Sequence, residues 1–527
     1  MWSDEIPLRT ARGFGPAAVT PHELSTMAAI EIMSRGGNAV DGAIAANAVQ
    51  GTVAPETCGV GGDLFALVYH PQKGNPPACL NSSGRAGSGA DASSLRQAGH
   101  RTMPEKGPPS VTVPGCVDGW YALSERFGRR PLAEVLGPAI RLAENGFAVS
   151  RELSEAWAAN ATQLLTQASA SPMFPDGRPP RLGESITRPY LAETLRSVIS
   201  GRDSFYLDRL GTEIPQATDH LITKEDLARC QADWVDPWSV DVFGKTVWTT
   251  PPNSQGYLTL ASLWIFEHLE VPPDLDSPDY WQGLIEAYRS MAWERDQALH
   301  DPQTGPPPNL LSLEILQSRL EQIDLSATCV WPPSPPASGG TAYMCTVDRE
   351  GMAVSLIQSN FHGIGSGLSA GRTGVWLHNR GAGFNLVPGH PNEWKPGRRP
   401  LHTLSPTIWT ENGRLSLVLG TRGGHQQPQL LTQVGAHLHH GGLGLAQTQL
   451  APRWTIRNIN SPDRYVSVER RTDPLLLDDL RGRGQRIRIE GSWEPDWGPI
   501  SMISVSPNGL RSAVSDPRVK TALALTG

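Results

Sequence analysis

The chain has 527 residues, which is enough for two or three domains or for one large layered domain divided by processing. Hydrophobic residues make up 39% and charged residues 18%, as in an ordinary globular protein with a large core. The formal charge of -7 argues against a nucleic acid or an anionic membrane as partner, and leaves small molecules or proteins.

The N-terminal residues 1–7 have neither the basic region nor the apolar stretch of a signal peptide. No segment approaches the apolar length that crosses a bilayer. The six cysteines lie far apart without CxxC spacing, which argues against a disulfide framework or a zinc site. We therefore expect a cytoplasmic protein without a metal or cofactor.

Two helices are predicted near the start of the chain. Thr20 as cap, Pro21 at the first position and Glu23 in a capping box are typical of a helix start, and Gly36-Gly37 ends that helix. Asn38 and Asp41 begin a second helix. Its residues are so small that we expect it to pack in the interior.

The glycine-rich stretch 59–63 precedes an apolar strand at 64–69. A phosphate-binding loop follows a strand and opens a helix, whereas the order here is reversed. A close approach between backbone segments is therefore the better interpretation of these glycines.

The later chain changes in character at Thr341. Residues 150–330 are predicted to be mostly helical, with proline-rich breaks. Strands are predicted at 341–347 and 351–358 around an Asp348–Gly351 turn, with others at 375–377, 415–419 and 500–505, and a helix at 430–437. Helices followed by a strand-rich part predict a layered α+β fold.

Thr341 is the candidate nucleophile. A threonine hydroxyl needs a base, and the residue's own α-amino group, with a pKa near 8, can serve once it is freed as a chain terminus. Gly339 and Gly340 permit the strained backbone that attack of the hydroxyl on the preceding carbonyl requires. Taken alone, Gly-Gly-Thr entering a strand is more typical of a simple turn.

Motifs that occur in order over nearly the whole chain favour the interpretation of Thr341 as a nucleophile over that of a simple turn. The sequence resembles the gamma-glutamyltranspeptidase family of N-terminal-nucleophile hydrolases. The resemblance is carried by residues 36–45, 59–63, 113–115, 127–128, 138–147, Thr341, 348–351, 399–401, 405–407, 420–424 and 515–518.

The resemblance implies a four-layer αββα sandwich made as one precursor. Self-cleavage at Gly340-Thr341 would give a large subunit, 1–340, and a small subunit, 341–527, which stay associated as a heterodimer; whether heterodimers assemble further is left open. Thr341 would form an acyl-enzyme with a small-molecule substrate. The second hydroxyl of the family falls on Ser359, and its oxyanion hole on the backbone N–H groups of Gly423 and Gly424.

The residues that bind a glutamyl group in the family have changed. The arginine for the α-carboxylate falls at Ser83, with Arg85 two residues on, and the two groups for the α-amino group fall at Phe361 and Gly383. Losing two charged hydrogen bonds, at about 1.5–3 kcal/mol each, weakens binding roughly 10²- to 10⁴-fold.

This pattern is similar to the non-glutamyl branch of the family, with oxamate amidohydrolase and the glutaryl-cephalosporin acylases. We therefore expect hydrolysis or transfer of a small carboxylate-bearing acyl group. An activated carbon–carbon bond is open to the same acyl-enzyme chemistry. The candidate substrate-binding residues are Arg85, Arg380, His402, Thr403 and Arg422.

Four alternatives stand beside this interpretation. Gly367–Gly371 fits the G-x-S-x-G pattern with Ser369 as nucleophile, but it leads into a predicted strand rather than a helix. The histidines 437, 439 and 440 lack evident companion ligands for a metal. The last two alternatives are a true gamma-glutamyltransferase or glutathione hydrolase, and an uncleaved, inactive binding or scaffold relative.

Overall fold

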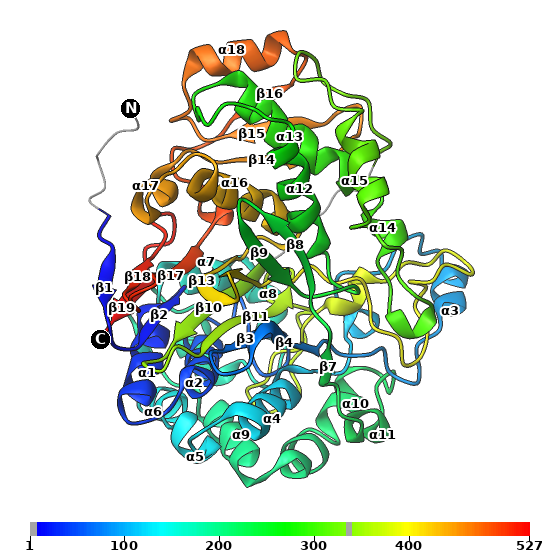
Figure 1. Cartoon of the computed structure of the whole chain (residues 1–527). Helices are drawn as coiled ribbons and strands as arrows, with labels where there is room; N and C mark the ends of the chain where they lie inside the picture. Colours follow the sequence, from blue (N-terminus) through cyan, green and yellow to red (C-terminus); the bar gives the residue numbers. More distant parts are fainter. Residues whose placement is uncertain (1–7, 334–339) are drawn as a thin grey trace.

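The computed structural model describes residues 8–333 and 340–527. Two seven-stranded sheets lie at its centre, and helices cover the outer face of each (Figure 1). Every pairing within the two sheets is antiparallel. The fold is thus the α+β four-layer sandwich that the sequence predicts.

The first sheet contains the strand that begins next to Thr341. Its order is β19 (Leu523–Thr526), β2 (Ala17–Thr20), β10 (Gly340–Val347), β11 (Ala353–Phe361), β3 (Asp63–His70), β4 (Gly74–Ser82) and β7 (Asp233–Val235).

The second sheet packs against the first. Its order is β1 (Ala11–Gly13), β18 (Arg511–Val514), β17 (Ile500–Val505), β13 (Arg414–Thr421), β12 (Thr407–Glu411), β9 (Lys245–Thr249) and β8 (Trp238–Val242).

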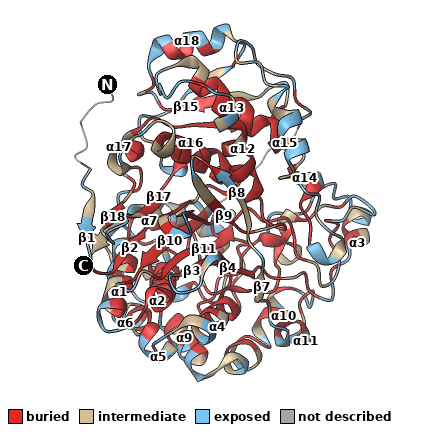
Figure 2. Ribbon diagram, viewed as in Figure 1, coloured by how far each residue is buried: buried red, intermediate tan, exposed pale blue. Residues whose placement is uncertain are grey.

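Alternation along β3 shows how the layers are built. Phe65 and Leu67 belong to the core between the two sheets, whereas Leu64 and Ala66 belong to the core beneath the helices. Successive side chains of a strand point to opposite faces, so a strand covered on both sides is apolar throughout. Figure 2 shows the central strands as buried.

Helices form the two outer layers, and each layer packs on one sheet through its own hydrophobic core. Those packed on the first sheet include α1 (Glu23–Ser34), α2 (Ala39–Val53), α4 (Cys116–Phe127), α6 (Gly137–Asn145) and α9 (Pro189–Ser200). Those packed on the second are α12 (Tyr257–His268), α16 (Gln427–His439) and α17 (Leu445–Leu450).

A smaller lobe extends from the second helical layer, at the top of Figure 1. Its helices and its three-stranded sheet share a core with α12 and α16. Its elements are α13 (Pro278–Ala292), α15 (Leu313–Leu320), α18 (Pro474–Gly482), β14 (Trp454–Arg457), β15 (Tyr465–Val468) and β16 (Ile487–Ile489).

Short elements complete the described chain. They are α3 (Ala92–Gln97), α5 (Leu132–Val135), α7 (Arg151–Ala159), α8 (Ala161–Leu164), α10 (Glu213–Ala217), α11 (Lys224–Ala228), α14 (Arg295–Ala298), and the pair β5 (Phe147–Ala148) and β6 (Ser185–Ile186). Within the described ranges, no helix has the length and apolar character to span a bilayer.

Two local predictions are wrong. The first helix begins at Glu23 with His22 as its N-cap, because the Thr20 hydroxyl bonds the His22 carbonyl instead of a helix N–H. Residues 375–377 form no strand; only Trp376 makes an isolated bridge, to Ser369. The mostly helical middle also contributes β7, β8 and β9 to the two sheets.

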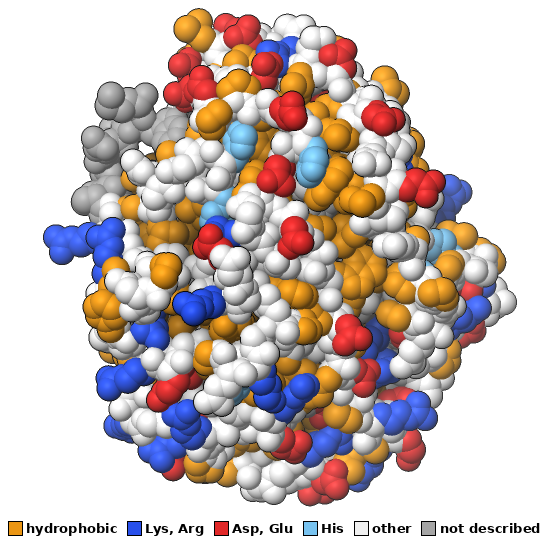
Figure 3. All heavy atoms as spheres, in the orientation of Figure 1, with side chains coloured by type: hydrophobic (Ala, Val, Ile, Leu, Met, Phe, Trp, Pro, Cys, Tyr) orange, Lys and Arg blue, Asp and Glu red, His pale blue; other side chains and the backbone are white. Residues whose placement is uncertain are grey.

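The surface carries charges of both signs. In the view of Figure 3, acidic and basic side chains occur together over the lower half of the molecule. A cavity of about 280 Å³ lies at the β4–β7 edge of the first sheet, lined by Lys73, Arg126, Phe127 and Trp234 among others.

Candidate active site

Thr341 lies beside Ser359 where β10 and β11 meet. The Thr341 Oγ1 donates a hydrogen bond of 3.3 Å to the Ser359 Oγ, and both residues are buried. The pairing register shifts between Gly340 and Ala342, whose partners Phe361 and Gln358 are three residues apart. The shift is a bulge, a feature that re-aims side chains and is common next to active sites.

Phe361 ends β11 in an unusual conformation. Its φ is +74°, in the left-handed region that a bulky residue rarely adopts. Its N–H donates to the Ser359 Oγ at 2.7 Å, and its ring lies 3.8 Å below the guanidinium of Arg380. Phe361 therefore links the hydroxyl pair to a buried cation.

The Gly423-Gly424 pair lies in the loop after β13, and both residues have positive φ. Gly424 opens a single 3-10 turn, and the first N–H groups of a helical turn lack partners within it. Next in the chain, His425 lies 6.3 Å from Phe361 between ring centroids. The loop is thus close to the end of β11, where N–H groups can face a developing oxyanion.

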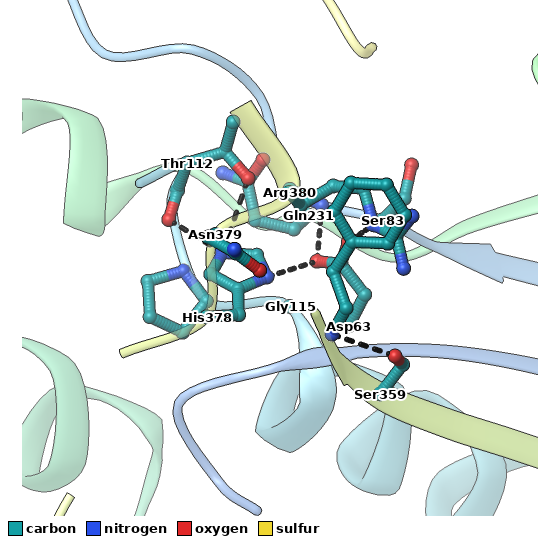
Figure 4. Close-up of polar contacts among 12 residues, drawn as sticks. Asp63, Ser83, Thr112, Gly115, Gln231, Ser359, His378, Asn379 and Arg380 are labelled. Atoms are coloured by element: carbon teal, nitrogen blue, oxygen red, sulfur yellow. Dashed lines mark hydrogen bonds and ion pairs between the residues drawn. The ribbon is translucent and has the colours of Figure 1, made fainter. Parts of the chain in front are cut away.

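A fully buried carboxylate organises the other side of the site (Figure 4). Asp63 begins β3, directly opposite Ser359 in the sheet register. Its Oδ2 accepts from the His402 Nε2 at 2.8 Å and lies 3.4 Å from the Arg380 Nε; its Oδ1 lies 3.5 Å from the His378 Nδ1. Because the His402 Nδ1 accepts from the Leu404 N–H, the Nε2 carries the proton.

The charges of this network follow from its burial and its pairing. Burial alone would raise the pKa of Asp63, but His378, His402 and Arg380 hold that pKa at about 2. Burial, with Arg380 nearby, lowers the pKa of His402 to about 3. Burial lowers the pKa of Arg380 to about 10, with Asp63 opposing the shift. At neutral pH the network therefore holds one carboxylate, one guanidinium and a neutral His402.

The structure brings some of the predicted substrate-binding residues together and holds others apart. Arg380, His402 and Thr403 belong to one buried cluster, in which the Arg380 Nη1 lies 3.4 Å from the Thr403 Oγ1. Arg85 pairs with Asp233 at 2.8 Å, and Arg422 pairs with Glu152 at 3.1 Å. Arg380 is therefore the predicted arginine that contacts the immediate neighbours of the hydroxyl pair, Phe361 and Asp63.

The rival sites have other surroundings. Ser369 lies in a loop, where its hydroxyl bonds the Gly371 carbonyl at 3.2 Å, and no strand-to-helix elbow is formed there. Among the three histidines, His437 bonds the Tyr280 hydroxyl, His440 bonds the Val271 carbonyl, and His439 lies against Trp409. These side chains have separate partners and converge on no common point.

Sequence reasoning missed Asp63, His378 and the pair formed by Arg295 and His425. The Nη1 of Arg295 contacts the His425 Nδ1, and both residues are buried. Asp63 stood in the sequence only as the end of a glycine-rich stretch. The one local signal was that Asp63 is a polar residue directly before an apolar strand. No other signal is local, because the partners of Asp63 are about 300 residues away.

Comparison with known proteins assigns the class. A family model described as gamma-glutamyltranspeptidase matches residues 25–526. The chain belongs to the gamma-glutamyltranspeptidase family. Its fold is that of the N-terminal-nucleophile hydrolases in this family.

Individual relatives match over nearly their full length. The glutathione hydrolase-like YwrD proenzyme of Bacillus subtilis (strain 168) is 33% identical over 95% of this chain and 96% of its own. The oxamate amidohydrolase proenzyme of Klebsiella pneumoniae is 33% identical over 96% of this chain and 98% of its own. The glutathione hydrolase proenzyme of Escherichia coli (strain K12) is 27% identical over 97% and 91%, respectively.

Among solved structures, the cephalosporin acylase of Bacillus halodurans superposes with a TM-score of 0.90 and 32% identity, covering 99% of this chain and 97% of its own. The relatives are thus named for different substrates, among them glutathione, oxamate and a cephalosporin. The chain is a hydrolase of the family, and its substrate has to be argued from the site.

Proposed function

We propose that this chain is a self-cleaving amidohydrolase in which Thr341, as a new N-terminus, forms an acyl-enzyme. The observation that carries the proposal is the 3.3 Å hydrogen bond between Thr341 and Ser359, within a family whose relatives are named proenzymes. Thr341 is only 1% exposed in the intact chain, as expected for a nucleophile that becomes accessible after processing.

The first step uses groups that lie around the β10–β11 bulge. The α-amino group of Thr341 takes the hydroxyl proton while the Oγ1 attacks the substrate carbonyl. The carbonyl oxygen becomes an oxyanion, which the N–H groups of Gly423 and Gly424 stabilise. Ser359, fixed by the Phe361 N–H, orients the Thr341 hydroxyl.

The second step returns the proton. The tetrahedral intermediate collapses, the C–N bond breaks, and the amine leaves with the proton that the α-amino group held. Water or another amine then attacks the ester carbonyl and releases Thr341. No metal is needed in this sequence of steps.

The proposed substrate carries a carboxylate on its acyl part and has no α-amino group. Arg380 supplies a buried guanidinium that lies on the ring of Phe361, whose N–H bonds the hydroxyl of Ser359. At Gly383, a Cβ would lie 2.5 Å from the Leu401 carbonyl, so an acidic side chain for an ammonium group has no room there. Phe361 presents an apolar ring where the family resemblance implies a second polar ligand. Two of the relatives, an oxamate amidohydrolase and a cephalosporin acylase, also carry non-glutamyl names.

Two measurements test this proposal. On denaturing electrophoresis the purified wild type should give two bands, near two thirds and one third of the 56.9 kDa chain, whereas Thr341→Ala should give one. The cleaved wild type should then hydrolyse glutaryl-p-nitroanilide faster than γ-glutamyl-p-nitroanilide, which differs by the α-amino group.

Each result has a defined meaning. A single wild-type band without activity supports the uncleaved binding or scaffold relative and refutes the proposal. Faster turnover of the γ-glutamyl anilide supports a true gamma-glutamyltransferase or glutathione hydrolase, and leaves the nucleophile intact while refuting the substrate class.

A further inference from the structure

Arg380 is a fully buried cation with one carboxylate partner among the described residues, Asp63. A buried charge without a partner is strongly destabilising. The guanidinium also lies flat on the Phe361 ring, at 3.8 Å, in a cation–π arrangement. Both contacts hold it on the side of the site where β11 ends.

Asp63 is itself held in one position. Its Oδ1 accepts from the Gly84 N–H at 3.0 Å and its Oδ2 from His402 at 2.8 Å. Its backbone pairs with Ser359 in the sheet. These contacts fix the position of the carboxylate. The ion pair with Asp63 therefore constrains the position of Arg380.

The way in which Asp63 contacts Arg380 leaves one edge of the guanidinium available. Asp63 lies at the Nε, and the Thr403 hydroxyl lies 3.4 Å from the Nη1. The Nη2 is buried and, like the Nε, has no hydrogen-bond partner in the described part of the chain, but the Nε has Asp63 as its ion-pair partner. A carboxylate can accept two parallel hydrogen bonds from the two Nη groups of a guanidinium. The unpaired Nη2 marks the place where such a group would sit.

We propose that Asp63 is a positioning residue that turns the Nη edge of Arg380 toward the acyl part of a bound substrate and so sets the selectivity for a carboxylate-bearing acyl group. The inference rests on the proposed function, because it concerns the same site. Asp63 acts through Arg380 and touches neither the scissile bond nor the nucleophile's hydroxyl.

The experiment compares two anilides of similar size, glutaryl-p-nitroanilide and the uncharged pentanoyl-p-nitroanilide, on cleaved protein. Wild type should prefer the glutaryl compound. Asp63→Asn should reduce kcat/KM for that compound by about tenfold or more, through KM, since one charge-assisted contact contributes about that factor. Its kcat/KM for the pentanoyl compound should change far less.

Two further variants make the test specific. Arg380→Gln should lose the same preference, and Asp63→Asn/Arg380→Gln should lose no more than either single variant, because both act on one contact. The control is Asp118→Asn, which removes another buried carboxylate, paired with Arg202 at 2.7 Å. It should lower stability without changing the ratio of the two substrates.

Every outcome decides the question. A wild type without preference for the glutaryl compound refutes both the proposed substrate class and this inference. A wild type with the preference, retained in Asp63→Asn, refutes the inference alone. If Asp63→Asn is insoluble, the double variant should restore soluble protein, because it removes the stranded guanidinium; failure to do so also refutes the inference.

Discussion

Glu56 is a buried acid close to the site. It lies in the loop after α2, where the neighbouring Thr57 carbonyl accepts from the Asn360 N–H at 3.2 Å. Neither of its carboxyl oxygens has a hydrogen-bond partner in the described part of the chain. Burial raises the pKa of Glu56 to about 8, so the group is largely protonated at neutral pH.

This raised pKa predicts how stability depends on pH. The folded state binds the proton more tightly than the unfolded chain, whose pKa is near 4.5. The group therefore has no effect below pH 4.5, and it destabilises the fold increasingly as the pH rises to 8, by up to about 1.4 kcal/mol per pH unit. Glu56→Gln should thus melt at a higher temperature than wild type at pH 8 and at a similar temperature at pH 4.5.

Thermal melting of the two proteins at both pH values is the measurement. Glu23→Gln, at an exposed position of α1, is the control for the loss of a carboxyl group. A Glu56→Gln protein that loses stability at pH 8 would show that the carboxylate is ionised and has an undescribed partner.

At the scale of elements, the glycine-rich segment before β3 is a packing feature. A Cβ on Gly62 would lie 2.3 Å from the Ser359 carbonyl oxygen, and one on Gly61 would lie 2.2 Å from the Trp376 carbonyl. Real Cβ atoms do not approach backbone oxygens so closely. The predicted close approach of backbone segments is therefore confirmed.

Gly62→Ala should displace β11 at Ser359. We expect a loss of stability of about 1–3 kcal/mol, as for overpacked cores, together with loss of self-cleavage. Gly482→Ala is the matched control, because nothing lies within 4 Å of its added Cβ and alanine favours the end of α18. Normal melting and cleavage in Gly62→Ala would contradict this account of the segment.

At this scale, the sequence predicts those elements that have a strong local pattern. The predicted helix start at Asn38 and Asp41 is confirmed, with their side chains in a capping box, and every residue of α2 is buried, as its small side chains predict. The strands β7, β8 and β9 were not located individually, because several of their residues are only partly buried and their apolar pattern is weak. The Asp63 network joins residues from 63 to 402, and no local period encodes such a contact.

At the scale of the whole molecule, the residues before and after Thr341 are interleaved in both sheets. In the first sheet β10 pairs with β2 on one side, and β11 pairs with β3 on the other. In the second sheet β12 pairs with β9, and β18 pairs with β1. The terminal strand β19 also pairs with β2, so five hydrogen-bonded strand pairs among the described residues cross between the proposed subunits.

The hydrophobic core between the sheets also joins the residues before Thr341 to those after it. The core between the sheets combines Phe65 and Leu67 from the first part of the chain with Tyr343 and Ile408 from the second. Neither part has a complete central sheet, or a complete core between the two central sheets, of its own. A fragment that ended at residue 340 would expose several apolar strand faces to water.

We therefore expect cleavage at Thr341 to leave one inseparable folded unit. The cleaved protein should elute in size-exclusion chromatography at the size of uncleaved Thr341→Ala, and give two bands only after denaturation. In urea, loss of the native elution volume and loss of secondary structure should occur in one transition, because the chains cannot separate without exposing the shared cores. Folded large and small chains that elute separately before that transition would contradict this expectation.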